Sequence, residues 1–195
     1  MSSPMDWRRI YDFWFPVDLS DADIVDHWGM MTWWMRGGAN AELPRFEPVV
    51  RAAKAGHLDS WLSTPRGRLS LIIVLDQFPR NMFRGDGRTH AADGKARGAS
   101  RYAVEHALDR ELPAFQRMFL YMPFMHSESV EDQRRSVELF ERLAGEKGAP
   151  DVVSYAVGHR DIVERFGRFP HRNEILGRET TPEEAEFLTT EGSSF

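Results

Sequence analysis

Apolar residues recur every three or four positions along most of this chain, which is the spacing that places them on one face of a helix. Clear stripes of this kind occupy residues 43–55, 112–122 and 152–166. The run from Leu71 to Leu75 is apolar at every position, so its composition would also suit a buried strand. Because its neighbours are all helical and no second strand candidate exists to pair with it, we predict a helix over residues 69–78.

Signals at the ends of the stripes delimit the other helices. Gly56 is placed to end the helix of residues 43–55, and Pro65 suits the first turn of the apolar helix. Thr181 and Glu184 have the spacing of a capping box, with a proline at the first helical position. Further stripes predict helices near residues 4–15, 20–36, 100–107, 129–144 and 182–188. We therefore expect an all-α fold of about nine helices stacked as antiparallel hairpins, with no sheet.

Composition narrows the class of protein. A chain of 195 residues suits one domain, here residues 1–195, with a mobile tail from about residue 190. The net charge of −5 and the lack of a long basic run argue against nucleic-acid binding. No apolar run approaches the ~20 residues that span a membrane, and no signal-peptide core exists, so we expect a cytoplasmic protein without membrane contact. The absence of cysteine excludes disulfides and thiolate sites.

Three polar segments share one design, an apolar helix followed by a proline and then charged side chains. They are residues 76–81, 122–128 and 165–178, and the last contains four arginines. Proline disfavours helix continuation, so Phe78, Met122 and Phe169 are expected to be helix ends or kinks. In a hairpin stack alternate helices end at the same edge, and the three segments could then line one polar site.

The residue types in these segments suit a small anion or an acidic peptide. Arginine forks match carboxylates and phosphates, and we assign this role to Arg80, Arg168 and Arg172, with histidines as further donors. Asp76 and Asp161 each lie four residues before an arginine and would orient it. The candidate ligand-binding residues are Asp76, Gln77, Arg80, Asn81, His126, Ser127, Glu128, His159, Asp161, Arg165, Arg168, His171, Arg172 and Asn173.

Other interpretations of the same residues stay open. The polar side chains could only cap helix ends, leaving a scaffold that binds a protein partner. Alternatively the chain is a hydrolase in which His126 or His171 is the general base, with Glu128 as a further catalytic candidate. No metal motif is present and the arginines would repel a cation, so we expect neither a metal nor a cofactor. Oligomeric state and ligand identity are not encoded in any motif.

Several longer blocks, spread over nearly the whole chain, carry a resemblance to one known family. These blocks are Phe13-Trp-Phe15, Gly56-His-Leu-Asp-Ser-Trp61, Thr64-Pro-Arg-Gly-Arg-Leu69, Leu75-Asp-Gln-Phe-Pro-Arg-Asn-Met-Phe-Arg84, Pro123-Phe-Met-His-Ser-Glu128, His159-Arg-Asp-Ile-Val-Glu-Arg-Phe-Gly-Arg-Phe-Pro-His-Arg-Asn173 and Leu176-Gly-Arg-Glu-Thr-Thr-Pro-Glu-Glu184. In these blocks the chain is similar to the bacterial "domain of unknown function 924" family, and the resemblance implies an all-α, tetratricopeptide-repeat-like fold. It implies no activity, because the family is itself uncharacterised. Residues 35–40 depart from the family pattern.

Overall fold

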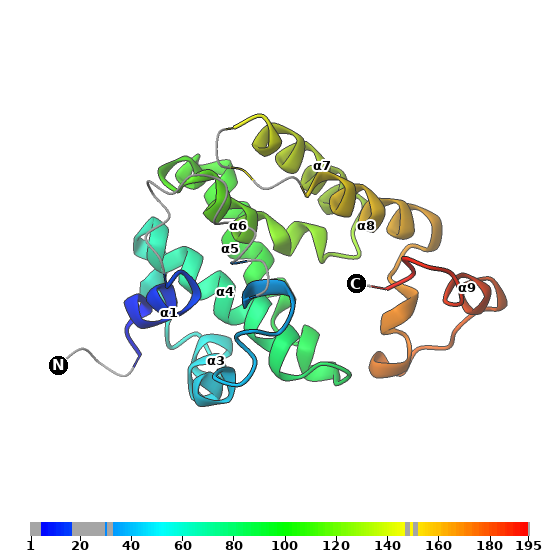
Figure 1. Cartoon of the computed structure of the whole chain (residues 1–195), viewed down its shortest axis with the longest axis horizontal. Coiled ribbons are helices and arrows are strands. Elements are labelled where there is room, and N and C mark those ends of the chain that lie inside the picture. The colour runs from blue at the N-terminus through cyan, green and yellow to red at the C-terminus, as the bar shows by residue number, and fades with distance from the viewer. Residues whose placement is uncertain (1–4, 17–29, 31–32, 147–148, 150–151, 195) are drawn as a thin grey trace.

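Helices joined by short turns make up the computed structural model, which describes residues 5–16, 30, 33–146, 149 and 152–194 (Figure 1). Within these ranges no strand is present, so the all-α prediction is confirmed. The hairpin-stack detail stays a prediction. The α-helices are α1 (Trp7–Trp14), α3 (Glu47–Lys54), α4 (Pro65–Met82), α5 (Asp93–Glu105), α6 (Ala114–Met125), α7 (Val130–Ala144), α8 (Val153–Phe166) and α9 (Pro182–Phe187).

Helix α4 is the centre of the fold, with α1, α3, α5 and α6 packed around it (Figure 1). Every residue from 67 to 79 is buried, which is why its sequence lacks a polar face. Thr64 caps the first turn by accepting a hydrogen bond from the backbone N–H of Gly67 at 3.2 Å. Phe78 packs against Trp14 and Phe46, with ring centroids 5.6 and 5.4 Å away. The apolar run is therefore a buried helix, as predicted.

Two prolines lie inside helices rather than at their ends, which corrects the sequence-based expectation. Helix α4 continues through Pro79 to Met82, and α6 continues through Pro123 to Met125. Proline lacks the backbone donor of an interior position, but near the end of a helix only one hydrogen bond is lost and the remaining turn persists. Because α4 persists, Arg80 stays on the same face as Asp76.

Other element boundaries also differ from the predicted ones. Residues 43–55 form a 3-10 turn, Leu43–Phe46, followed by α3, because Pro44 and Pro48 interrupt the regular helical hydrogen bonding. The glycine-rich segment 85–98 contains a 3-10 turn, Gly87–His90, and the first turn of α5. The helix predicted for residues 20–36 lies mostly outside the described residues, of which 33–35 are helical.

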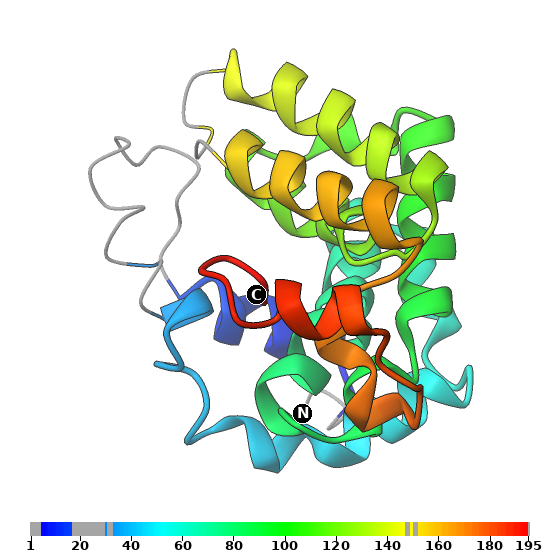
Figure 2. The same cartoon turned by 90° about the vertical axis from the view of Figure 1, so that its right-hand side faces the viewer.

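Helices α6, α7 and α8 pack in succession. The C-terminal segment, residues 167–194, runs below α7 and α8 in Figure 2. Helix α8 ends at Gly167, whose φ of 70° suits a residue without a side chain. Two 3-10 turns, Pro170–Arg172 and Glu174–Leu176, then lead to α9. The predicted capping box of Thr181 and Glu184 is confirmed, with both of its hydrogen bonds made. This segment brings the arginine-rich stretch back to α4 and α6.

No helix in the described part of the chain is long and apolar enough to cross a membrane.

Candidate functional site

The Asp76 carboxylate has no exposed surface and lies between two helices. Its Oδ1 is 2.8 Å from Nδ1 of His126 at the end of α6, and 3.1 Å from the Arg80 guanidinium one turn along α4. The side-chain amide of Gln77 donates to Oδ2 at 2.6 Å. These contacts join segments 76–81 and 122–128, as the sequence predicted. The carboxylate fixes both the imidazole and the guanidinium.

Asp93, in the first turn of α5, is a member of the site that the sequence did not indicate. Both of its carboxylate oxygens accept hydrogen bonds from Arg80 at 2.9 Å, in a bidentate pair. Nδ1 of His90 lies 3.3 Å from Oδ2 of the same carboxylate. The spacing of three residues between His90 and Asp93 was the available signal. The surrounding glycines, which are poor helix formers, obscured it.

Arg172 is the buried cation contributed by the C-terminal segment. One guanidinium nitrogen donates to the backbone oxygen of His126 at 3.0 Å, and the group lies 4.3 Å from the centre of the Phe169 ring. Among the described residues, the ion-pair partner of the Arg172 guanidinium is the Asp93 carboxylate, whose Oδ2 lies 4.0 Å away. The residue is only 6% exposed, and its Nε has no hydrogen-bond partner among the described residues. Its hydrogen-bonding capacity is thus not fully used.

His159 and His171 complete the site around Phe169. The Phe169 ring lies 5.6 Å from the ring of His159 and 5.5 Å from that of His171. Nδ1 of His159 donates to the backbone oxygen of Tyr155 at 2.7 Å, and its ring is 6.2 Å from that of His126. We call this group of side chains the Arg172 cluster: Asp76, Arg80, His90, Asp93, His126, His159, His171 and Arg172.

Burial keeps His126, His159 and His171 neutral. Burial, followed by the charge of nearby Arg80, lowers the pKa of His126 even though Asp76 opposes the change. Burial likewise lowers the pKa of His159 to about 3 and that of His171 to about 4, with Arg172 adding to both effects. At neutral pH these three imidazoles therefore carry no charge.

The charged members of the cluster remain ionised. Burial opposes ionisation of Asp76, but Arg80 and His126 outweigh it and leave its pKa below the ordinary value. Burial also opposes ionisation of Asp93, whose pKa nevertheless falls well below the ordinary range because of His90 and Arg80. Burial lowers the pKa of Arg172 to about 10, so the guanidinium is still protonated at neutral pH.

Glu128 holds the C-terminal segment in place instead of facing the histidines. Its carboxylate accepts two hydrogen bonds from Arg178, at 2.9 and 2.8 Å, and one from the backbone N–H of Phe169 at 2.9 Å. Burial raises the pKa of Glu128, but Arg178 and the Phe169 amide outweigh it and hold the pKa below the ordinary value. A carboxylate with these three donors is a structural anchor and a poor general base.

Three further candidates have partners that separate them from the cluster. Arg168 makes a bidentate pair with Glu184, at 2.6 and 2.8 Å, so this guanidinium is already matched to a carboxylate. Asn173 also donates to Glu184, at 3.2 Å. Ser127 donates to Asp132 at 2.7 Å, while Ser129 caps α7. Ser127 is therefore engaged by the beginning of α7.

Asp161 and Arg165 do not form the predicted pair, although they lie four residues apart on α8. Asp161 instead pairs with Arg160 at 2.6 Å, and Arg165 pairs with Glu183 at 2.9 Å. Asp161, Arg165 and Glu183 are exposed and Arg160 is half-buried, and neither pair includes a member of the cluster, so neither orients a cation of the cluster. Asn81 follows Arg80 on α4 and is half-buried.

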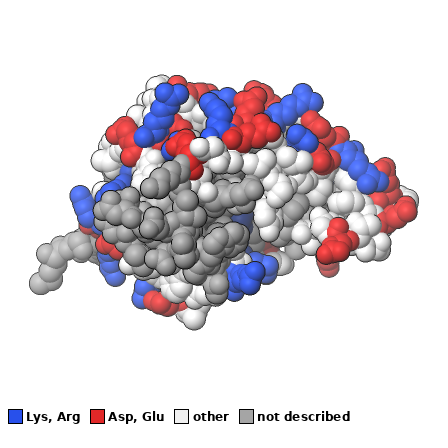
Figure 3. Space-filling model, turned by 45° about the horizontal axis from the view of Figure 1, so that its top comes forward, with Lys and Arg blue, Asp and Glu red and all other residues white. Residues whose placement is uncertain are grey.

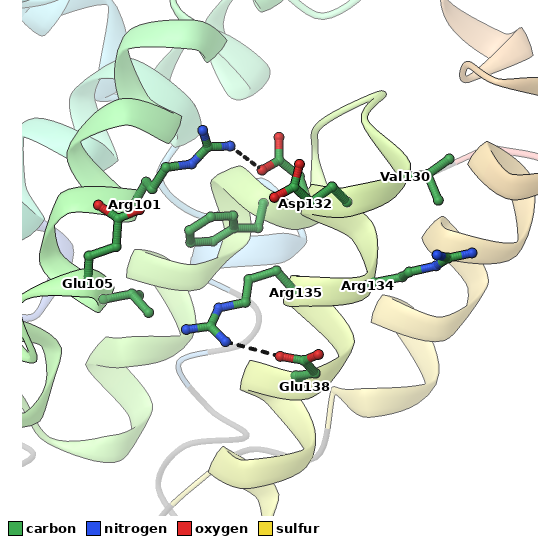
Figure 4. A pocket seen from close by; sticks show the side chains of 10 residues that line it. Arg101, Glu105, Val130, Asp132, Arg134, Arg135 and Glu138 are labelled. Atoms are coloured by element: carbon green, nitrogen blue, oxygen red, sulfur yellow. Dashed lines mark hydrogen bonds and ion pairs between the residues drawn. The ribbon is translucent and has the colours of Figure 1, made fainter.

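A groove of about 670 Å³ lies between α5, α6 and α7, apart from the Arg172 cluster (Figure 4). Arg101 donates to Asp132 at 2.6 Å at one side, and Arg135 donates to Glu138 at 3.0 Å at the other. Positive and negative side chains alternate along the upper edge of Figure 3. Such mixed charge is typical of a solvated surface, and the partner-binding hypothesis would apply to this groove.

In the described part of the chain no three His, Asp or Glu side chains are grouped so that they could hold a metal ion. The cluster is an arrangement of two carboxylates, two guanidiniums and four imidazoles. Chemically it can bind oxygen atoms, donate hydrogen bonds and accept them.

Comparison with known proteins places the chain in a family. Residues 10–192 match the model of a bacterial protein family of unknown function, DUF924. The chain belongs to this family. A DUF924 fold is thus built around the contacts described above, and the resemblance noted in the sequence is confirmed. No curated protein matches the chain.

A solved structure supports the fold of this DUF924 chain. The chain is similar to the structure of a protein of unknown function, ATU0120, from Agrobacterium tumefaciens, with 38% sequence identity and a TM-score of 0.74. The match covers 94% of this chain and 96% of that one. Neither comparison assigns a ligand or a reaction.

Proposed function

We propose that this protein binds a small oxyanion, a carboxylate or a phosphate, at the Arg172 cluster. The observation that carries the proposal is the guanidinium of Arg172, which is 6% exposed and has an Nε without a partner among the described residues. A buried donor left without an acceptor costs about 1–3 kcal/mol, and more when it is charged. A ligand oxygen would supply the missing acceptor.

The neighbouring contacts make Arg172 the principal anchor. Arg80 is already matched by both oxygens of Asp93 and by Asp76, and Arg168 is matched by Glu184. Among the described residues, Arg172 has a carbonyl oxygen at 3.0 Å and a carboxylate at 4.0 Å. A planar guanidinium supported by an aromatic ring presents two donors in a fixed direction, which suits an oxyanion. Its depth favours a small ligand over a peptide tail.

A thermal-shift screen with acetate, citrate, inorganic phosphate and nucleotides tests the proposal. A ligand at about 100 times its dissociation constant adds roughly 2.7 kcal/mol to the free energy of unfolding. For a chain of this length each kcal/mol raises the midpoint by about 2–4 °C. At least one oxyanion is expected to raise the midpoint by several degrees.

Two arginine variants locate the effect. Arg172→Gln removes the buried cation and keeps a polar, hydrogen-bonding side chain. Arg165→Gln is the matched control, since Arg165 lies in the same segment but pairs with Glu183 in an exposed position. The stabilisation should disappear in the first variant and persist in the second. A flat screen, or equal stabilisation of both variants, would contradict the proposal.

Hydrolysis is a second candidate function because Asp76 and His126 have the arrangement of a general-base pair. The carboxylate fixes Nδ1 at 2.8 Å and leaves Nε2 as the basic nitrogen. Against it, burial lowers the pKa of His126 and makes the imidazole a weak base. Turnover of phosphate or carboxylate esters that is lost in folded His126→Gln protein would favour hydrolysis. If an oxyanion stabilises the protein but no ester is turned over, the protein binds the oxyanion and does not hydrolyse the ester.

A further inference from the structure

The charged side chains of the Arg172 cluster balance one another. The two guanidiniums of Arg80 and Arg172 face the two carboxylates of Asp76 and Asp93, so their charges sum to zero. A monoanion entering this site would bring one uncompensated negative charge away from water and a dianion would bring two, so the site should favour the lower charge. The inference below rests on the proposed oxyanion site and concerns which oxyanion the site takes.

Two imidazoles of the cluster have the same tautomer. Nδ1 of His126 faces the Asp76 carboxylate, and Nδ1 of His159 faces the backbone oxygen of Tyr155. Carboxylate and carbonyl oxygens only accept hydrogen bonds, so Nδ1 carries the proton in each neutral ring. Nε2 is then a hydrogen-bond acceptor in both.

A ligand therefore meets donors and acceptors in one place. Arg172 offers N–H donors, and the imidazole of His126, whose backbone oxygen Arg172 already contacts, offers an acceptor. An oxyanion without a proton presents only lone pairs and would place one of them against Nε2. An oxyanion that retains one proton can accept from the guanidinium and donate its O–H to the imidazole.

We propose that the Arg172 cluster selects a phosphate monoester in its singly protonated form over a sulfate ester. A phosphate monoester loses its second proton with a pKa of about 6, so the protonated form is accessible near neutral pH. A sulfate ester has the same charge and a similar shape but no proton to donate. The protonated phosphate thus satisfies Nε2 of His126, and a sulfate leaves it facing an oxygen.

The groups around His126 set the pH dependence of this recognition. Asp76 and Arg80 face it from α4, Asp93 from α5, His159 from α8, and Arg172 from the C-terminal segment. The carboxylates and guanidiniums keep their charges at neutral pH. The ligand itself titrates near neutral pH, so affinity should fall about tenfold for each pH unit above its pKa.

Methyl phosphate and methyl sulfate are the matched probes. Calorimetric titration of the full chain with each, near neutral pH in two buffers of different ionisation enthalpy, gives the affinity and the number of protons taken up. We expect methyl phosphate to bind with an uptake approaching one proton as the pH rises above about 7. Methyl sulfate should bind at least about tenfold more weakly, the loss of one good hydrogen bond.

The outcomes separate this inference from the proposed function. Equal binding of methyl sulfate, or binding of methyl phosphate without proton uptake, overturns the inference and leaves the oxyanion site in place. Failure of methyl phosphate, methyl sulfate and acetate to bind overturns both. His126→Gln should reduce the preference for phosphate, whereas His106→Gln, remote from the cluster on α5, should leave it unchanged. The comparison on the unaltered chain stands even if His126→Gln does not fold.

Discussion

Asp76 and His126, fifty residues apart in the sequence, are joined by a contact of 2.8 Å between Oδ1 and Nδ1. The carboxylate has no exposed surface, and the same oxygen also lies 3.1 Å from Arg80. One buried charge therefore joins the central helix α4 to the end of α6 and aligns two side chains of the Arg172 cluster. This contact explains why polar residues occupy helix positions that are otherwise apolar.

Replacing Asp76 by alanine should strongly destabilise the fold. The change leaves the His126 imidazole without its acceptor and removes one of the two carboxylates that neutralise Arg80. Breaking a buried ion pair from one side costs about 3–5 kcal/mol. Urea unfolding followed by circular dichroism measures this loss against the unaltered chain. A loss below about 1 kcal/mol, which is typical of an exposed pair, would show that the carboxylate is not buried as described.

Stability should decrease as the pH is lowered from about 6.5 towards 4, owing to His159 and His171. Burial lowers the pKa of these residues to about 3 and 4, from 6.5. Within this range the unfolded chain binds protons that the folded chain excludes. Their contribution is therefore complete above pH 6.5 and is lost on acidification, with a slope of at most about 1.4 kcal/mol per pH unit for each imidazole.

Urea unfolding at several pH values measures this slope. His159→Gln should make it shallower, because the variant has lost one of the excluded protons. His57→Gln is the control, since His57 is exposed and lies outside the cluster. Stability that stays constant between about pH 6.5 and 4 would mean that the imidazoles can be protonated in the folded protein.

Gly67 is required at the beginning of α4, unlike Gly98 in α5. A Cβ at this position would lie 2.5 Å from the backbone oxygen of Trp61 and 2.7 Å from the Thr64 hydroxyl. Gly67→Ala should lower the free energy of unfolding by about 1–3 kcal/mol, although alanine is the better helix former. Gly98→Ala, with nothing within 4 Å, should instead raise it by about 0.5–1 kcal/mol. Equal effects of both changes in thermal unfolding would contradict the close packing at Gly67.

Most helices could be predicted because their signals are local. The run from Leu71 to Leu75 and the capping box of Thr181 and Glu184 depend on neighbours within a few residues, and both predictions are confirmed. The end of α4 was misplaced because Pro79 is a strong local signal against a helix. The helix nevertheless continues for one more turn, to Met82. Around this turn Asp76 contacts His126 and Arg80 contacts Asp93, both of which are distant in the sequence.

The site was predictable only as far as its residue types reveal it. Asp76, Arg80, His126, His159, His171 and Arg172 were named as candidates from polar clusters beside apolar helices, and the structure brings them together. Asp93 was missed because its role depends on Arg80, thirteen residues away, and not on its own glycine-rich surroundings. Arg168 was assigned to the ligand because its carboxylate partner, Glu184, lies beyond a turn whose direction the sequence does not specify.

NMR of the histidine rings during titration with inorganic phosphate tests the central claim most directly, because it reports where a ligand binds. The account predicts that resonances of His126, His159 and His171 shift together and saturate. Those of His57 and His106, which lie outside the cluster, should stay in place, and Arg172→Gln should abolish the shifts. Unchanged cluster resonances, or equal shifts at all of these histidines, would contradict an oxyanion site at Arg172.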